Sequence, residues 1–328
     1  MISIVMPMRN AMPYLNECVT SIINQTYTDW ELIVVNDHST DSSHAVLSEF
    51  ALIDNRITVI NTTGKGIIDA LQLAYSKTSG TYITRMDADD IMPEQKLELM
   101  YNQLLKTPNC VVTGKIKYIG ENLRDGYRKY EAWMNTMMED NTHNEYMYKE
   151  CVIPSPAWMT SREVFESIGG FTPETYPEDY DLTLRFYKAK ITIVAVNELV
   201  HIWRDYQERT SRNDPNYSFN SFEVLKTNYF LDIDYDNTKT LVLWGAGKKG
   251  KKIAQLLIEK NIQFVFACNN PKKINKDIYG MIMENSDTIF DTQKKYQTII
   301  AIANPIEQLE IKTTLKNELP NVKPYWFC

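Results

Sequence analysis

The sequence predicts an α/β protein in which a parallel β-sheet is built twice, in two domains of unequal size. Three observations lead to this prediction. Buried strands alternate with helical segments over residues 2–86, a cluster of acids follows the fourth strand, and Gly-x-Gly-x-x-Gly follows a later strand at residues 245–250. Strand–helix alternation is typical of parallel sheets with right-handed crossovers. At 328 residues the chain exceeds the ~250 residues at which single cores usually stop growing, so two domains are expected.

Continuous apolar runs mark strands that are buried on both faces of a sheet. The expected strands of the first half span residues 2–6, 31–35, 57–60 and 82–86. Helical spacing separates them, and the expected helices cover residues 14–25, 43–50, 67–74 and 93–106. This half has no Gly-x-Gly-x-x-Gly after its first strand and no Gly-x-x-x-x-Gly-Lys-Ser/Thr, so dinucleotide binding and P-loop chemistry have little support there.

Three carboxylates, those of Asp87, Asp89 and Asp90, crowd the end of the fourth strand. Like charges packed this closely repel one another and add nothing to a core. Mg²⁺ and Mn²⁺ prefer carboxylate oxygens, and ligands of open α/β sheets bind beyond the carboxyl ends of the strands. The cluster therefore indicates a divalent-cation site. The alternative is an acidic loop that caps the helix of residues 93–106 through its dipole.

Two further acids, Asp37 and Asp69, stand at places that allow two interpretations. Asp37 follows the second strand, from which an acid can reach a ribose or a base edge; alternatively it forms an Asx-turn or an N-cap in the loop of residues 36–43. Asp69 lies near the start of a helix, where an acid is favoured by the helix dipole alone.

The composition is that of a globular protein, with 44% hydrophobic and 23% charged residues. A net charge of −7 argues against a nucleic-acid partner. Five scattered cysteines without a Cys-x-x-Cys pair indicate neither a zinc site nor a disulfide scaffold, which suits the cytoplasm. Residues 1–7 read as a first strand, not a signal peptide, and no apolar run approaches the ~18 residues of a membrane span. We expect a cytoplasmic protein with at most peripheral membrane contact at the inner face.

Four motifs occur in a fixed order: Pro-x-x-Asn at residues 7–10, Ser-Ile-x-x-Gln-Thr-Tyr at 21–27, Glu-Leu-Ile-Val-Val-Asn-Asp-His-Ser-Thr-Asp at 31–41, and Gly-Thr-Tyr-Ile-Thr-Arg-Met-Asp-Ala-Asp-Asp at 80–90. Over residues 1 to 210 the chain resembles the family-2 inverting glycosyltransferases of the GT-A fold. The resemblance implies a nucleotide-sugar donor, most plausibly UDP-linked, and a glycan or glycolipid acceptor. It also implies Mn²⁺ or Mg²⁺ as cofactor.

The same resemblance assigns roles to individual residues. Asp37 would bind the nucleotide base or ribose, Asp87 would contact the nucleotide or donor sugar, and Asp89 would hold the metal on the diphosphate. The donor-binding positions that it implies are Pro7, Asn10, Asp37, Asp69, Arg85, Asp87 and Ala88.

Inverting transfer needs one base beside the acceptor hydroxyl, because an alcohol is too weak an acid to ionise first. A lone Asp at a helix start is normally a cap. Glu178 and Asp179, however, follow a Gly-Gly-Phe turn at residues 169–171 and match the Glu-Asp element of the family, whose Asp is the base. Asp179 is therefore the expected base and Glu178 the residue that positions the acceptor, whereas Asp181 is expected to be structural.

The chain departs from the family at the segment of residues 199–206. Many members place a metal-binding His three residues after the aromatic that precedes an Arg, and here that position holds Tyr206. We expect His201 to be a buried strand residue, so that the metal would depend on Asp89, phosphates and water. Three nearby arginines either meet the diphosphate or pair on the surface with Asp205 and Glu208; they are Arg204, Arg209 and Arg212.

The stretch of residues 118–149 is rich in Tyr, Met and charge and has weak periodicity. Its larger side chains could line an acceptor cleft, but we favour a role in covering the sheet because Met and aromatic stripes are more often core. They are Trp133, Met134, Met137, Met138, Tyr146 and Tyr148.

The domains are expected at residues 1–212 (GT-A) and 239–328 (Rossmann-like), joined by a connecting helix and linker at 213–238. In the second domain the expected strands cover residues 240–244, 264–268 and 298–303, and the helices 251–260 and 306–317. Residues 239–276 hold nine Lys and one acid, so the glycine loop is a candidate anion site formed by Gly245, Gly247 and Gly250. Asn269 and Asn270 stand where a ribose-binding acid would be needed, which disfavours NAD. The alternative is a unit for packing or for a homodimer contact.

Two rival functions remain at this point. A nucleotide-sugar-binding regulator would share the donor site, with the second domain sensing another ligand. A nucleotidyltransferase also uses carboxylates and metal, but it would normally have a Gly-rich basic loop after the first strand, which residues 7–13 lack.

Overall fold

The structure, a computed structural model, describes residues 1–121, 123–207, 209, 219–291, 294–320 and 322–328. It divides into two compact units. Unit 1 holds residues 1–143 and the described part of 152–213, and unit 2 holds residues 144–151 and the described part of 214–328. The predicted α/β fold class is confirmed in both units. The expected domain boundary at residues 212 and 213 lies outside the described residues and stays a prediction.

Unit 1 is built on a seven-stranded mixed sheet with the order β3-β2-β1-β4-β6-β5-β7. Its strands are β1 (Ile2–Met8), β2 (Trp30–Asn36), β3 (Ile57–Asn61), β4 (Tyr82–Arg85), β5 (Cys110–Ile119), β6 (Trp158–Ser161) and β7 (Thr192–Arg204). The first four are parallel, as the apolar runs predicted. β6 is antiparallel to both β4 and β5, and β5 pairs in parallel with β7. β6 was not predicted, because its residues Trp-Met-Thr-Ser form neither a continuous apolar run nor an alternation of apolar and polar residues.

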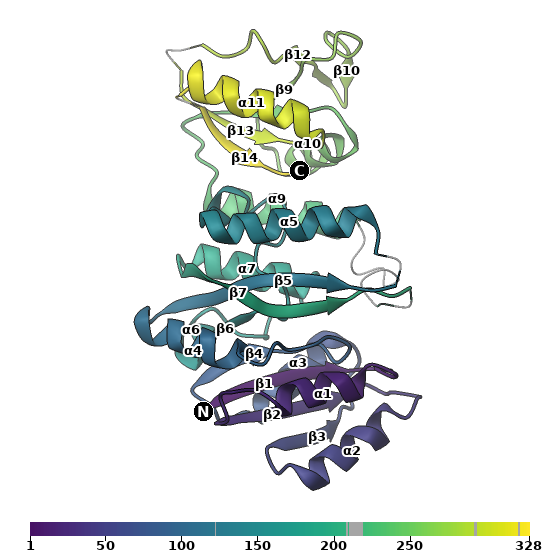
Figure 1. The fold of residues 1–328 in the computed structure, drawn as a ribbon. Coiled ribbons are helices and arrows are strands. Elements are labelled where there is room, and N and C mark those ends of the chain that lie inside the picture. Colours follow the sequence, from purple (N-terminus) through teal and green to yellow (C-terminus); the bar gives the residue numbers. More distant parts are fainter. Residues whose placement is uncertain (122, 208, 210–218, 292–293, 321) are drawn as a thin grey trace. The chain divides into compact units, whose positions relative to one another are not determined.

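Helices cover both faces of this sheet (Figure 1). α1 (Leu15–Ile23) and α2 (Ser43–Ile53) pack against each other on one face, and α3 (Ile67–Ser76) lies on the other. The change of face accompanies a reversal of strand order, because β2 and β4 flank β1 on opposite sides. Ligands of doubly wound sheets bind at such a switch point, outside the carboxyl ends of the strands. The ends of β1, β2 and β4 therefore define where a site is expected.

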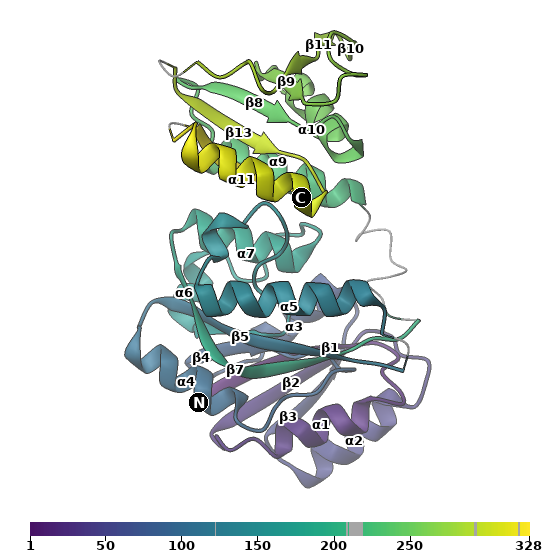
Figure 2. The same cartoon turned by 45° about the horizontal axis from the view of Figure 1, so that its top comes forward.

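α4 (Lys96–Lys106) and α5 (Asp125–Asp140) complete the cover of the sheet. Figure 2 shows α5 running along β5, and its buried residues Met134, Met137 and Met138 confirm that this Met-rich stretch covers the sheet. The weak periodicity of the sequence had not predicted this sixteen-residue helix. Tyr146 and Tyr148, which follow the short η1 helix (His143–Glu145), belong to unit 2.

α6 (Arg162–Ser167) and α7 (Glu178–Lys188) follow β6. Between them the backbone turns at Gly169 and Gly170, whose φ angles of 87° and 52° lie in the left-handed region that favours glycine. The expected Gly-Gly turn is thus present. It allows the chain to reverse before the acid-rich start of α7.

Unit 2 contains a five-stranded parallel sheet with the order β12-β9-β8-β13-β14, and a two-stranded antiparallel pair, β10 with β11. The strands are β8 (Thr240–Trp244), β9 (Val265–Cys268), β10 (Asp277–Ile278), β11 (Met281–Ile282), β12 (Glu284–Asn285), β13 (Tyr296–Ile300) and β14 (Val322–Trp326). α9 (Phe219–Ile233) packs against α10 (Lys248–Glu259), and α11 (Pro305–Asn317) lies on one face of the sheet (Figure 1). α10 begins three residues earlier than the sequence predicted, directly after Gly247. Nowhere in the described residues is there a helix with the length and apolarity that a bilayer crossing requires.

Candidate active site

The loops after β1 and β2 are tied together at the carboxyl edge of the sheet. Oδ1 of Asn10 accepts a hydrogen bond of 2.7 Å from the backbone N–H of Thr40, and the N–H of Asn10 donates to Oγ of Ser39 at 3.0 Å. Pro7 lies in β1 itself, opposite Val35 of β2. The structure therefore brings the first and third of the four motifs together at this edge of the sheet, although the donor roles of Pro7 and Asn10 stay predictions.

Asp37 lies at the end of β2 with only 5% of its surface exposed. Its Oδ2 accepts a 3.0 Å hydrogen bond from the backbone N–H of Gly66, which precedes α3. Its Oδ1 is buried and has no hydrogen-bond partner among the described residues. A buried carboxylate oxygen without a donor is costly. A ligand N–H or O–H at this position would remove that cost.

Asp69, in the first turn of α3, closes the loop that leads into the helix. Its Oδ2 accepts a 2.7 Å hydrogen bond from the backbone N–H of Lys65. The same oxygen lies 2.4 Å from the place where a Cβ on Gly64 would stand, so the loop needs glycine there. The local, structural interpretation thus accounts for the observed contact, and the donor role of Asp69 stays a prediction.

The acid loop, residues 87–90, separates its three carboxylates. The side chain of Asp87 is 19% exposed and Asp89 is also half-buried, whereas Asp90 is completely buried. Asp90 forms a 2.9 Å hydrogen bond with Nε2 of His201 and accepts one of 2.8 Å from the backbone N–H of Arg204. The sequence had grouped all three acids as one cation site. Asp90 instead turns into the protein and anchors the loop.

Burial sets the protonation of the acid loop. It raises the pKa of Asp89 to about 6, with the neighbouring charge of Asp90 as the second cause, and it raises the pKa of Asp90 to about 7. Burial acts on Asp87 in the same direction, but the cations of Arg85 and Arg209 outweigh it and hold the pKa of Asp87 below its ordinary value. Such a site favours the entry of a further positive charge.

Arg85, the last residue of β4, connects the acid loop to α7. Its Nε donates to Oδ1 of Asp87 at 2.9 Å, and one of its terminal nitrogens donates to Oε1 of Glu178 at 3.1 Å. The Arg85 side chain is only 5% exposed. Asp87 and Glu178, which lie some 90 positions apart in the sequence, therefore both contact the guanidinium of Arg85.

Asp179 is half-buried in the first turn of α7, beside Glu178. Its Oδ1 accepts a 2.8 Å hydrogen bond from the backbone N–H of Tyr180. Burial and the adjacent Glu178 charge raise the pKa of Asp179 to about 7. Asp181, by contrast, forms a 2.8 Å ion pair with Arg185 one turn along α7, which agrees with its expected structural role.

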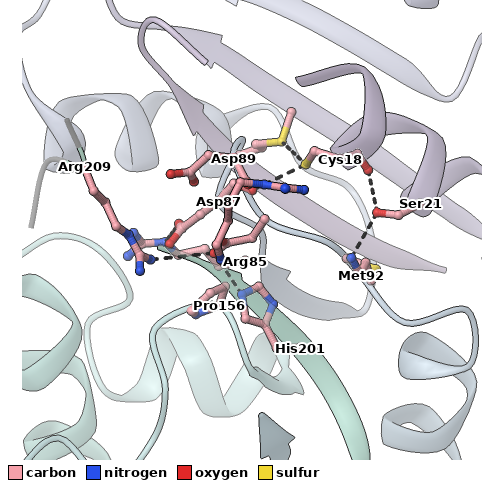
Figure 3. A network of polar contacts seen from close by, with 12 residues as sticks. Cys18, Ser21, Arg85, Asp87, Asp89, Met92, Pro156, His201 and Arg209 are labelled. Carbon is pink, nitrogen blue, oxygen red and sulfur yellow. Dashed lines mark hydrogen bonds and ion pairs between the residues drawn. The ribbon is translucent and has the colours of Figure 1, made fainter. Parts of the chain in front are cut away.

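The end of β7 reaches the acid loop from another side (Figure 3). His201 is fully buried in β7, as expected, and burial holds its pKa well below the ordinary value. Arg204 pairs with Glu17 of α1 rather than with Asp205, and its Nε donates to the backbone carbonyl of Asp89 at 3.0 Å. The Glu17 contact could not be found from sequence, because 187 positions separate the partners.

Two more side chains of this region touch or face the acids. The hydroxyl of Tyr206 donates to Oδ2 of Asp89 at 2.6 Å. The guanidinium of Arg209 lies 3.8 Å from Oδ2 of Asp90, and the three acids of the loop raise the pKa of Arg209 above its ordinary value. Arg212 lies outside the described residues.

The outward-facing acids fit a divalent cation only with help from a ligand. Oδ1 of Asp89 and Oδ2 of Asp87 have no hydrogen-bond partner in the described part of the chain, and carboxylate oxygens are the donors that Mg²⁺ and Mn²⁺ prefer. Within the described residues, no three His, Cys, Asp or Glu side chains are grouped so that they could hold a metal by themselves. Phosphate oxygens and water would have to complete the coordination.

A hollow of about 430 Å³ adjoins the acid loop on the side of α1. It is lined by Glu17, Thr20 and Asn24 of this helix region and by residues 91–94, which follow the acids. Asp37, Asp87, Asp89 and Asp179 do not line it. The hollow therefore does not contain the predicted donor, metal and base residues.

The glycine loop of unit 2 is shaped by sterics. A Cβ on Gly250 would lie 1.8 Å from the carbonyl oxygen of Gly245, whose φ of 123° itself requires glycine. Gly247 has open space around it. Lys273 donates from Nζ to the carbonyl of Ala246 at 2.8 Å, which ties the loop to the segment after β9. The candidate anion site stays a prediction.

Most of unit 1 matches a known protein family. The family model described as "Glycosyl transferase family 2" matches residues 3–169. The chain belongs to this family. The match covers β1 to the Gly169 turn, so it includes the acid loop and Arg85.

Curated relatives agree with this membership. Glycosyltransferase GlyG of Streptococcus pneumoniae is 29% identical over 216 residues, which cover 62% of this chain and 70% of that protein. The UDP-Glc:alpha-D-GlcNAc-diphosphoundecaprenol beta-1,3-glucosyltransferase WfgD of Escherichia coli is 31% identical over 198 residues, covering 60% of this chain and 73% of WfgD. Glycosyltransferase GlyA of S. pneumoniae is 27% identical over 221 residues, which cover 64% of this chain. The matched region spans only 31% of the length of GlyA.

Solved structures share the fold of this family-2 chain at low sequence identity. TarS of S. aureus in complex with UDP-GlcNAc superposes with a TM-score of 0.56 and 16% identity, covering 78% of this chain and 71% of the TarS chain. Mannosyltransferase PcManGT of Pyrobaculum calidifontis, in complex with GDP-Man and Mn²⁺, gives 0.51 and 17%, with 77% and 68% covered. At this identity the likeness establishes the GT-A-type fold alone.

Proposed function

We propose that this chain is a metal-dependent inverting glycosyltransferase that moves a sugar from a UDP-linked donor to a hydroxyl of a glycan or glycolipid. The observation that carries the proposal is the contact of Arg85 with both Asp87 and Glu178, since it gathers the acid loop and the start of α7 at one site. The name of WfgD, which is 31% identical to this chain, specifies a UDP-Glc donor and a lipid-linked acceptor. That name favours UDP over other nucleotides.

The nucleotide would be recognised at the ends of β1 and β2. The unpaired Oδ1 of Asp37 is positioned to accept a hydrogen bond from the base or the ribose. Asn10 holds the neighbouring loop through Thr40, so the wall of the nucleotide site is fixed before the donor arrives. Such preorganisation lowers the ordering cost of binding.

Asp179 would act as the general base. A pKa of about 7 leaves this carboxylate partly ionised at neutral pH and basic enough to take the proton of an acceptor hydroxyl as the new bond forms. Glu178, held by Arg85, would orient the acceptor beside it. General-base catalysis of this kind typically contributes about 10²–10⁴-fold to the rate.

Asp89, with Asp87 beside it, would hold Mn²⁺ or Mg²⁺ together with the donor phosphates. The chemistry that such a cation supplies is stabilisation of charge on the departing diphosphate. Arg209, whose guanidinium lies 3.8 Å from Oδ2 of Asp90, adds a fixed positive charge beside the loop. The homodimer contact and the peripheral membrane contact expected from sequence stay predictions.

The decisive experiment compares Asp179→Asn with Asp181→Asn. A thermal-shift screen of nucleotide sugars with Mn²⁺ or Mg²⁺ first identifies the donor, because a ligand that binds only the folded state stabilises it. Release of UDP in the presence of acceptor glycans is then measured. We expect Asp179→Asn to lower kcat by about 10²–10⁴-fold with donor binding unchanged.

Asp181→Asn is the matched control, since it makes the same change two residues along α7 at a side chain that pairs with Arg185. It should keep kcat within a few-fold of the parent, provided that its melting curve shows a folded protein. Equal activity of Asp179→Asn and the parent would refute the assigned base. Donor binding without any transfer by the parent chain would favour a regulator instead.

A further inference from the structure

The segment directly after β7 holds the acid loop at three points. The backbone N–H of Arg204 donates to Asp90 at 2.8 Å, Nε of Arg204 donates to the carbonyl of Asp89 at 3.0 Å, and the hydroxyl of Tyr206 donates to Oδ2 of Asp89 at 2.6 Å. The first holds the side chain of Asp90, and the second holds the backbone of the loop at Asp89. The third fixes the orientation of the Asp89 carboxylate itself.

Tyr206 is held firmly enough to play this part. Its ring lies against that of Tyr14, with 5.0 Å between the ring centroids. The guanidinium of Arg204 covers the other ring, that of Tyr14, at 4.5 Å, and Arg204 is in turn paired with Glu17. Tyr206 thus packs against Tyr14 at the start of α1, and Arg204 covers Tyr14 in turn. These contacts hold the hydroxyl of Tyr206 beside Asp89.

We propose that Tyr206 is a positioning residue for the cation site: its hydroxyl occupies Oδ2 of Asp89 and leaves Oδ1 as the oxygen that faces a divalent cation bound with a nucleoside diphosphate. The inference rests on the proposed function, because it assumes a cation at Asp89. The described residues hold no three-ligand group, so the orientation of the Asp89 carboxylate matters for a cation that phosphate oxygens and water also bind.

The chemistry of a phenol explains why Tyr206 would orient Asp89 without binding the cation itself. A neutral tyrosine hydroxyl is a good hydrogen-bond donor to a carboxylate but a weak ligand for a divalent cation. An imidazole at the same place would present a nitrogen, which Mn²⁺ and Zn²⁺ accept far more readily. A single substitution at Tyr206 can therefore remove the positioning bond or supply the missing ligand. Outer groups that orient a metal ligand typically change metal affinity by about 10–100-fold.

The test is a titration of Mn²⁺ followed by the electron paramagnetic resonance signal of the free ion, with and without UDP. It compares the parent chain with Tyr206→Phe, Tyr206→His and the control Tyr14→Phe. The control removes a phenolic hydroxyl that has no hydrogen bond among the described residues and keeps the ring on which Tyr206 packs. UDP affinity without metal and the melting temperature are measured for each variant.

We expect the parent and Tyr14→Phe to bind Mn²⁺ only when UDP is present. Tyr206→Phe should bind Mn²⁺ with UDP on the order of 10-fold more weakly, with metal-free UDP affinity unchanged. Tyr206→His should bind Mn²⁺ without UDP. Equal Mn²⁺ affinity of Tyr206→Phe and the parent would overturn the positioning role. Absence of Mn²⁺ binding by the parent even with UDP would remove the metal from the proposed function and this inference with it.

Discussion

The guanidinium of Arg85 lies 3.1 Å from the carboxylate of Glu178, and both side chains are almost completely buried. Because Arg85 ends β4 and Glu178 begins α7, this single contact joins two elements that the family motifs place far apart in sequence. The other side of Arg85 holds Asp87. The guanidinium of Arg85 therefore joins Asp87 to Glu178, the neighbour of the expected base Asp179.

Arg85→Lys tests that dependence. A lysine ammonium is a point charge and cannot reproduce the fork that meets two carboxylates at once, so either Asp87 or Glu178 loses its contact with this side chain. Breaking a buried pair typically costs about 3–5 kcal/mol, and we expect a loss approaching this range in urea unfolding, together with a fall in kcat. Arg56→Lys is the control, because Arg56 pairs with Asp54 away from the acid loop and is 30% exposed. Equal losses in the two variants would contradict the bridging role.

The pKa of Asp179 predicts how the rate of transfer depends on pH. The base works only as a carboxylate, and its pKa is raised to about 7 by burial and by Glu178. We expect kcat/KM to fall about tenfold per pH unit below this value and to level off above it. The measurement is a pH–rate profile between pH 5 and pH 9 with the identified donor. A rate that stays constant down to pH 5 would contradict the assignment.

The same pKa makes a separate prediction about stability. The folded-state pKa of Asp179 lies above its ordinary value of 3.8, so the folded protein retains a proton that the unfolded chain releases between these values. Stability therefore falls as the pH rises from about 4 to about 7, and Asp179→Asn removes this loss. At pH 8 the variant should melt at least about 2–4 °C above the parent, which corresponds to ~1 kcal/mol for a unit of this size. Near pH 4 the two should melt together, and a constant difference across the range would exclude this cause.

Much of unit 1 follows from local sequence. The apolar runs predicted β1 to β4 and their parallel pairing. The polar residues that follow these strands accordingly lie at the carboxyl edge of the sheet. The inward turn of Asp90 could not be predicted, because its partners, His201 and the backbone of Arg204, come from more than a hundred positions later. Three acids within four residues of a turn look alike in sequence, and only tertiary contacts distinguish the buried anchor from the candidate ligands.

Other features lacked a local signal altogether. β6 is only four residues long and pairs antiparallel on both sides, so its pairing depends on neighbours that are distant in sequence. Residues 144–151 join unit 2, where the hydroxyl of Tyr148 donates to Asp234 at 2.8 Å. β14 contains Pro324, which argues against a strand, but β14 is an edge of the sheet and tolerates a missing donor. Position in the fold overrides local preference at each of these places.

The glycine loop of unit 2 allows a test in which two glycines, Gly250 and Gly247, have different predicted outcomes. A Cβ on Gly250 would lie 1.8 Å from the carbonyl oxygen of Gly245, and backbone must move to make room. Gly250→Ala should therefore destabilise unit 2 by at least about 1–3 kcal/mol. Gly247 has nothing within 4 Å and a φ of −78°, so Gly247→Ala should leave stability within about 0.5 kcal/mol.

The measurement is thermal unfolding of the full chain, followed by a probe placed in unit 2. If Gly247→Ala keeps the parent stability, it can also report on the candidate anion site, because the open side of Gly247 is where a phosphate could approach the backbone. Pyrophosphate or UDP that stabilises the parent but not Gly247→Ala would support that site. Equal destabilisation by the Gly247 and Gly250 substitutions would show that the loop is shaped by contacts other than the Gly245–Gly250 approach.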